Sequence, residues 1–262
     1  FVNCAAAKKI YVYDLSGNFK RSFAHPKDTE YMDVLNYDKD NLICYDASVY
    51  YKDGQSREEG KSYHSLISKK DGSVTRDIYL PYDIIKTPCV HQGDGVAMTS
   101  VRPIIPNRGE WLLVDCSSDT VYNYVPEKNK LVPFFVKAPT KDPEILLTMG
   151  AVTDRYYFLH TVKKEFDFTT GRGFFMNDFM YDKQTNELYK AKVLNSDFVK
   201  KRSVDMFLHP INNNGIAAVQ TLSAGQLVEA YQEDGLKGRL KEVAAGLDEE
   251  SNPVVMLVKY KN

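Results

Sequence analysis

The amino-acid sequence predicts an all-β fold, a β-propeller of four-stranded antiparallel blades, and three observations carry this prediction. Short runs with period-two alternation, rich in β-branched and aromatic residues, dominate the chain. Few segments with helical periodicity lie between these runs, whereas an α/β protein alternates strands with helices. Turn motifs with Gly or Asn recur at nearly equal intervals, which is typical of a repeated β-rich unit such as a propeller blade.

Length and composition exclude several classes of protein. The chain has 262 residues, of which 43% are hydrophobic, and its formal net charge is −1. Because no basic block stands apart, the sequence does not predict binding to nucleic acid or to an anionic membrane. The longest apolar run, Val254–Val258, is far shorter than the roughly 20 residues of a transmembrane helix. The 18 Tyr and 13 Phe supply enough buriable surface to exclude disorder.

The strand predictions rest on runs that are bounded by polar turns. Each run combines β-branched or aromatic residues with an alternation of apolar and polar positions. The runs are Ile10–Tyr13, Asn41–Tyr45, Glu110–Val114, Thr120–Tyr124, Tyr156–His160, Phe174–Tyr181 and Val254–Tyr260.

Four hairpin turns reveal the repeat. Gly17, Gly72, Asn129 and Asn186 stand where a tight turn needs positive φ, and each is followed two positions later by an apolar residue. They are separated by 55, 57 and 57 residues. With the blade strands named a to d from the axis outward, we expect all four turns between strands c and d, on one face of the ring.

This phasing assigns strands to blades. Residues 10–23 supply strands c and d of one blade, and we expect three complete blades over residues 30–80, 89–137 and 144–194. The last blade has three strands, Ser203–His209, Gly215–Leu222 and Asn252–Tyr260. We therefore expect a single propeller domain over residues 1–262, an open arc of four to five blades that lacks its N-terminal blade or blades and that upstream sequence would complete.

A helical insert is predicted over residues 223–251. Ser223 and Gln226 have capping-box spacing, and apolar residues then recur at helical spacing. We expect Gly235 and Gly238 to divide the insert into two short helices, and Gly246 to end it. Two interpretations stay open: the apolar stripe only packs the insert onto the ring, or it also forms the wall of a pocket. The stripe consists of Leu227, Tyr231, Leu236, Leu240, Val243 and Leu247.

Three segments resemble a known family. Residues 10–23 resemble the strand-turn-strand signature of NHL-like propellers. Residues 118–124 with 130–136, and the closing stretch 249–261, are similar to six-bladed β-propeller proteins of the Bacteroides type. This resemblance implies a six-bladed ring when complete, a lipoprotein or secretory signal upstream, and a cell-envelope or secreted location. It implies no established activity.

The cysteines and histidines show no metal-site spacing. The four cysteines lack CxxC spacing, and the five histidines include no HExxH pair. We expect Cys44 and Cys116 to be buried, reduced thiols, although a disulfide stays open in an oxidising compartment. No metal and no cofactor are predicted.

Long b–c connections mark the candidate binding face. Residues 47–61, 163–172 and 223–251 are long and would share one face of the ring, and insertions on one face of a repeat protein are typical of a binding surface. Two of them mix aromatic rings with Arg and carboxylates, which suits sugar stacking or protein contacts and also suits ordinary surface loops. The candidate binding residues are Tyr50, Tyr51, Arg57, Arg102, Arg155, His160, Phe166, Asp167 and Arg172.

Two function classes follow from these residues. The first is a non-enzymatic binding or scaffold module of the cell envelope that holds a glycan, a peptide or a partner protein on the long-loop face. The alternative is a lyase or hydrolase at the central channel, which requires Arg102, Arg155 and His160 to converge on one mouth. The sequence contains no nucleophile elbow or phosphate loop that would favour the enzyme.

Overall fold

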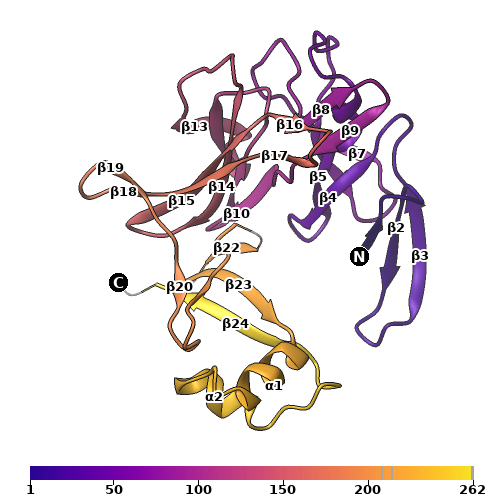
Figure 1. Ribbon diagram of the computed structural model, residues 1–262. Helices are drawn as coiled ribbons and strands as arrows, with labels where there is room; N and C mark the ends of the chain where they lie inside the picture. Colours follow the sequence, from indigo (N-terminus) through magenta and orange to yellow (C-terminus); the bar gives the residue numbers. More distant parts are fainter. Residues whose placement is uncertain (208, 214, 261–262) are drawn as a thin grey trace. The chain divides into compact units, whose positions relative to one another are not determined.

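The computed structural model describes residues 1–207, 209–213 and 215–260, and it confirms the mostly-β prediction (Figure 1). Its larger sheets are antiparallel, three with four strands and two with three. The described residues form two compact units. The first comprises Phe1–Ile104, Leu112–Leu146 and Lys163–Phe174, and the second comprises Ile105–Trp111, Leu147–Val162 and the described part of Phe175–Asn262.

The predicted blade over residues 30–80 is confirmed. It consists of β4 (Tyr31–Asn36), β5 (Asn41–Asp46), β6 (His64–Ser68) and β7 (Val74–Ile78), paired in that order. Strand β5 is buried along nearly its whole length, whereas β7 is mostly exposed, as expected for an inner and an outer strand. The core on one side of this sheet is formed by Ile10, Tyr31, Leu42, Cys44 and Ile67.

The first sheet has one strand more than the sequence predicted. Strands β2 (Lys9–Tyr13) and β3 (Phe19–Ala24) match the predicted pair, and β1 (Val2–Cys4) adds an antiparallel strand beside β2. The prediction missed β1 because three residues are too few to show an alternation.

The phasing predicted for residues 89–137 is wrong. The four-stranded sheet there consists of β10 (Ile104–Asn107), β11 (Glu110–Leu113), β12 (Thr120–Val125) and β13 (Lys130–Val136). Residues 89–98, which the predicted blade included, form a separate hairpin of β8 (Cys89–Gln92) and β9 (Gly95–Met98). A short hairpin has the same local turn and strand signals wherever it pairs, so the sequence could not distinguish it from the inner half of a blade.

The predicted blade over residues 144–194 is confirmed as a four-stranded sheet. Its strands are β14 (Ile145–Val152), β15 (Tyr156–Lys163), β18 (Met176–Asp182) and β19 (Glu187–Lys190). The long b–c connection folds into a hairpin of its own, β16 (Phe166–Asp167) with β17 (Arg172–Gly173).

The last sheet corrects one predicted strand. It consists of β22 (Pro210–Asn213), β23 (Ile216–Leu222) and β24 (Val254–Lys259), so its first strand begins after the predicted Ser203–His209. Within that segment, the carbonyl of Met206 instead accepts a hydrogen bond from the amide of Ala151 in β14. Leu208, within the predicted strand, lies outside the described residues. A short hairpin, β20 (Leu194–Asn195) with β21 (Arg202–Ser203), precedes Met206 along the chain.

The helical insert contains two helices, as predicted. Helix α1 spans Ala224–Gln232 and α2 spans Gly238–Ala244 (Figure 1). Ser223 is the N-cap, but its side chain makes no capping hydrogen bond, so the capping box is not formed. Tyr231 of the predicted stripe is exposed. The buried cluster beneath the helices is Phe198, Leu227, Ala230, Leu236, Leu240 and Ala244.

The four repeat turns are confirmed between the third and fourth strands of their sheets, counting β2 and β3 as such a pair. Gly17, Gly72, Asn129 and Asn186 have φ values of 83°, 79°, 45° and 58°. Asn129 follows a short 3₁₀ helix, η2 (Pro126–Lys128), and accepts a hydrogen bond from the Tyr124 hydroxyl at 2.9 Å. A second 3₁₀ helix, η1 (Ala47–Tyr51), begins the insertion after β5.

Candidate functional site

In the insertion at residues 47–61, the candidate residue Arg57 anchors the loop and the candidate residue Tyr51 is exposed. The guanidinium of Arg57 donates to the carbonyl of Leu80 at 2.7 Å and lies 4.9 Å from the ring centre of Tyr82. Tyr50 is half-buried and packs on Tyr45, with ring centres 6.0 Å apart. Tyr51 is 74% exposed, so its ring is available to a ligand.

The second insertion is a compact aromatic hairpin. The ring of Phe166 lies 4.9 Å from Phe168 and 5.6 Å from Phe174. The Thr170 hydroxyl and the amides of the turn donate to the carboxylate of Asp167, and these hydrogen bonds lower its pKa. Arg172 is exposed and pairs with Asp167 across the β16–β17 register. The Phe residues therefore hold the hairpin together, and the charged residues face solvent.

An ion-pair network joins the two insertions. The ammonium of Lys164 lies 2.9 Å from both carboxylate oxygens of Asp53 and 3.5 Å from Glu144. Lys86 extends the network with a 3.0 Å contact to Glu144. Asp53 also accepts hydrogen bonds from the amide and the hydroxyl of Thr87, at 2.7 and 3.0 Å. Only 10% of the Lys164 side chain is exposed, so solvent screens this pair less than an ordinary surface pair.

Sequence reasoning missed Asp53 and Lys164 although both lie in or beside the insertions it selected. The two residues are 111 positions apart, and neither belongs to a recognisable motif. Only pairing information between distant positions could have identified them.

The aromatic hairpin also packs against the β8–β9 hairpin. A Cβ atom at Gly95 would lie 2.9 Å from the ring of Phe168, so the close approach requires glycine there. The misassigned hairpin therefore supports the second insertion.

Arg102 has a charged neighbour in the first unit. Burial raises the pKa of Asp33, and the positive charge of Arg102 partly offsets that rise. Arg102 itself is half-buried.

Arg155 fixes the end of its own sheet. Its Nε lies 3.1 Å from both carboxylate oxygens of Asp182, and its Nη2 lies 2.7 Å from one of them. The guanidinium also covers the ring of Tyr156 at 4.9 Å. The hydrogen bonds from Arg155 lower the pKa of Asp182, which also accepts the amide of Gln184 in the following turn. These contacts engage the Nε–Nη2 edge of the guanidinium, so Arg155 is first of all a structural partner of Asp182.

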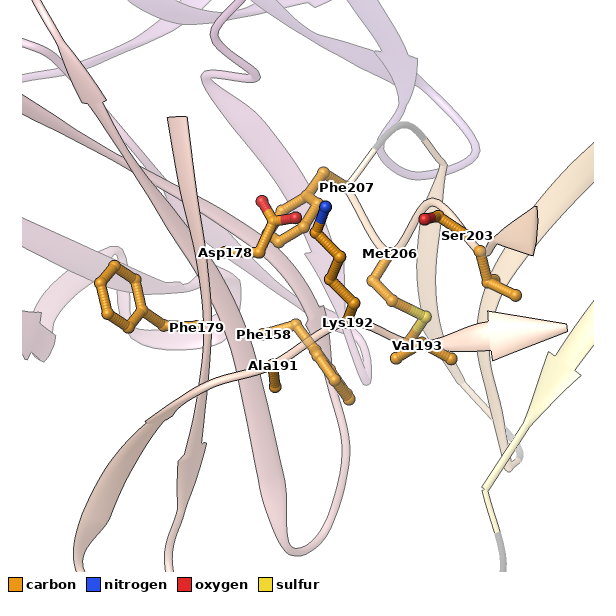
Figure 2. A pocket seen from close by; sticks show the side chains of 10 residues that line it. Phe158, Asp178, Phe179, Ala191, Lys192, Val193, Ser203, Met206 and Phe207 are labelled. Carbon is orange, nitrogen blue, oxygen red and sulfur yellow. The ribbon is translucent and has the colours of Figure 1, made fainter. Parts of the chain in front are cut away.

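His160 is buried in the second unit, with its ring centre 4.3 Å from that of Phe207. Burial lowers its pKa, and within the described residues its Nε2 has no hydrogen-bond partner. Figure 2 shows a cavity that Phe207 lines together with Asp178, Lys192 and other side chains. Its volume of about 30 Å³ matches roughly one water molecule rather than a substrate.

Arg155 and His160 have different partners. Arg155 precedes β15 and pairs with Asp182, whereas His160 lies within β15 and packs on Phe207. No contact between Arg155 and His160 is therefore found in the described part of the second unit.

All four cysteines are free thiols. Cys44 is fully buried as predicted, whereas Cys116, three residues after the end of β11, is only half-buried. Burial raises the pKa of both thiols. Within residues 1–207, 209–213 and 215–260, no group of three or more His, Cys, Asp or Glu side chains is arranged to hold a metal ion.

Comparison with known proteins decides the family. A family model described as a six-bladed β-propeller matches residues 1–217. The chain belongs to this propeller family. A crystal structure from Bacteroides fragilis, of a protein inferred to be exported, superposes with a TM-score of 0.57 at 14% identity. The superposition covers 98% of this propeller chain and 73% of that one, and at this identity it shows the fold alone.

No curated protein matches this propeller chain. Neither helix in the described part of the chain is long and apolar enough to cross a membrane.

Proposed function

We propose that this propeller is a non-enzymatic binding or scaffold protein whose ligand contacts the loop face, defined here as the insertion 47–61 together with the hairpin 163–174. The ligand is a glycan, a peptide or a partner protein. The observation that carries the proposal is the Lys164–Asp53 ion pair at 2.9 Å, because it holds two insertions from different sheets in a fixed relation. A preorganised surface loses less conformational entropy on binding than two independent loops would.

The exposed side chains of the loop face suit such ligands. Tyr51 offers a ring that can stack on a sugar or cover an apolar side chain. Asp167 and Arg172 are exposed on the hairpin and offer a carboxylate and a guanidinium for hydrogen bonds. Arg57 and Phe166 support this surface from within, because the contacts that they make are with other residues of the protein.

A glycan array followed by isothermal titration calorimetry on the full-length protein tests the proposal. We expect a ligand whose affinity falls about tenfold in Tyr51→Ala and in Arg172→Ala, in line with the loss of one ring or charged contact. Tyr231→Ala is the matched control, since it removes an exposed ring from α1. Clear substrate turnover without binding, or equal losses in the control, would contradict the proposal.

We also propose that the protein is exported and acts in the cell envelope or outside the cell, with a lipid anchor in upstream sequence as one route. The fold shared with a Bacteroides fragilis protein that is inferred to be exported supports this location. Treatment of intact cells with a protease tests it. Degradation of the full-length protein on intact cells, or its recovery from the medium or periplasm, is the expected result, and recovery only with the cytosol would contradict it.

A further inference from the structure

A polar cavity of about 230 Å³ lies at one end of the β4–β7 sheet, in the first unit. It is several times larger than the roughly 30 Å³ that one water molecule occupies in the liquid. The end of β5, the beginning of β6, the end of the insertion and the outer strand β7 all contribute to its lining. The side chains that matter are Thr29, Tyr31, Asp46, Lys61, Ser65 and Asp77.

Asp46 is the innermost charged group of this cavity. Its side chain is 3% exposed, and its Oδ1 accepts hydrogen bonds from the amides of Glu30 and Ser48 at 2.8 and 3.0 Å. Its Oδ2 accepts no hydrogen bond within the described residues, and the ammonium of Lys61 lies 3.3 Å away. Lys61 therefore balances the charge of Oδ2 without a hydrogen bond, so this buried oxygen keeps unused capacity to accept one.

Asp77 gives the cavity a second acceptor. It is exposed, it stands opposite Ser65 in the β6–β7 register, and across the described part of the chain it makes no ion pair or side-chain hydrogen bond. With Asp46 and Lys61, the formal charge of the lining is −1. This charge favours a cationic occupant.

The hydroxyl groups of the lining leave further capacity for hydrogen bonds. The Tyr31 hydroxyl and the Ser65 Oγ are 3.2 Å apart, and only one of them can donate to the other. The hydroxyl of Thr29 donates to the carbonyl of Pro26 and keeps its lone pairs as acceptors. The cavity therefore combines two carboxylates with hydroxyls that can bind hydroxyls of a ligand.

We infer that this cavity binds a small molecule that carries a primary ammonium group beside hydroxyl groups, the chemistry of an amino sugar or an amino alcohol. The ammonium interacts with Asp77 at the rim and with the field of Asp46 behind it. The ligand hydroxyls interact with Tyr31, Ser65 and Thr29. This inference does not rest on the function proposed for the loop face, because Tyr51, Asp167 and Arg172 do not line the cavity.

Isothermal titration calorimetry with three related probes tests the inference. Glucosamine carries the ammonium at about pH 6.5, below the ordinary pKa of an amino group. N-acetylglucosamine blocks that amine, and glucose replaces it with a hydroxyl. We expect glucosamine to bind the full-length protein at least tenfold more tightly than either neutral sugar.

Two variants locate the binding. Asp77→Asn removes the rim charge with little change of shape, and we expect it to weaken glucosamine binding about tenfold. Asp94→Asn is the matched control, since Asp94 is exposed in the β8–β9 turn and does not line the cavity, and we expect unchanged binding. An unchanged circular dichroism spectrum of Asp77→Asn, whose side chain is exposed, verifies its fold.

Three results would overturn the inference: no heat of binding with glucosamine, equal affinity for the three sugars, or equal affinity in the parent and Asp77→Asn. Tyr51→Ala separates this site from the loop face. If the cavity acts as inferred, that variant keeps its affinity for glucosamine even when it loses a ligand of the loop face.

Discussion

Asp46 is the last residue of β5 and Asp115 lies two residues after β11, each strand being the second of its sheet, and the two carboxylates use the same local arrangement. In each residue, Oδ1 accepts the amide two positions later, from Ser48 at 3.0 Å and from Ser117 at 2.8 Å. In each residue, Oδ2 is buried without a hydrogen bond among the described residues. The repeat thus places an equivalent carboxylate at the end of two inner strands.

The connection that follows decides what each carboxylate faces. After Asp46 comes the long insertion, which returns Lys61 to within 3.3 Å of Oδ2. After Asp115 only a short turn precedes β12, and the groups that feel the charge of this carboxylate are the hydroxyls of Tyr45 and Tyr82. Burial raises the pKa of both hydroxyls, and the charge of Asp115 raises them further. A repeated fold therefore sets where a charge lies, and an insertion sets its partner.

Truncation of the two carboxylates should give the largest difference. Asp46→Ala removes the acceptor of two backbone amides and leaves Lys61 unpaired, so we expect a loss of about 3 kcal/mol in the free energy of unfolding. Asp115→Ala removes the acceptor of one amide, and we expect a loss of about 1.5 kcal/mol. Urea-induced unfolding followed by circular dichroism measures both. Equal losses would show that Lys61 contributes nothing at Asp46.

The backbone requirements of the repeat and of the insertion can be compared at two glycines, Gly72 in a repeat turn and Gly54 in the insertion 47–61. Gly72 and Gly54 both have positive φ, at 79° and 75°, but a Cβ atom at Gly72 would collide with the ring of Phe23 whereas the space around Gly54 is open. We expect Gly54→Ala to cost about 1 kcal/mol, from the left-handed backbone alone. Gly72→Ala should cost about 2–3 kcal/mol, because overpacking adds to that strain. Thermal unfolding of the pair tests this, and equal shifts would mean that Phe23 moves aside freely.

The repeat turns could be predicted from the sequence because their requirement is local. Positive φ at Gly17, Gly72, Asn129 and Asn186 depends on the residue itself, and the equal spacing then identified the repeat. Strand β5 was equally clear because its apolar run is buried in the sheet.

The remaining features depend on contacts that local patterns do not contain. In sequence the β8–β9 hairpin resembles half a blade, and only the structure shows that it forms a two-stranded sheet of its own. Ser223 has the spacing of a capping box but leaves its bond unmade, because spacing does not fix a rotamer. In the candidate site, Tyr51 and Arg172 were selected for residue type, whereas Asp53 and Lys164 were missed because their meeting is a property of the fold.

A buried histidine near each of these two carboxylates makes the stability of the fold depend on pH. Burial lowers the pKa of His25 and of His64 below the ordinary 6.5, and the charges of Asp46 and Asp115 respectively oppose that shift. Below about pH 6.5 these histidines therefore bind more protons in the unfolded chain than in the folded one. Their contribution to the free energy of unfolding is complete above that pH and is lost as the pH drops.

Each histidine can contribute at most about 1.4 kcal/mol per pH unit to this fall. We expect His64→Gln to flatten the loss of stability between about pH 6.5 and 5. His91→Gln, which changes an exposed histidine, serves as control. Urea unfolding at several pH values measures the slope, and a slope unchanged in His64→Gln would contradict the prediction.

The smallest expected effect concerns the ion pair that joins the insertions. Lys164→Met keeps the aliphatic stem but removes the ammonium between Asp53 and Glu144, and we expect a loss of about 1 kcal/mol. Lys163→Met removes a pair with Glu165 that is 40% and 45% exposed, and it should cost close to nothing. Because the network acts between insertions, hydrogen exchange in residues 163–174 should accelerate in Lys164→Met and not in Lys163→Met. If exchange there is the same in both variants, the aromatic packing of Phe168 on Gly95 holds the hairpin by itself, and the loop face does not depend on its charges.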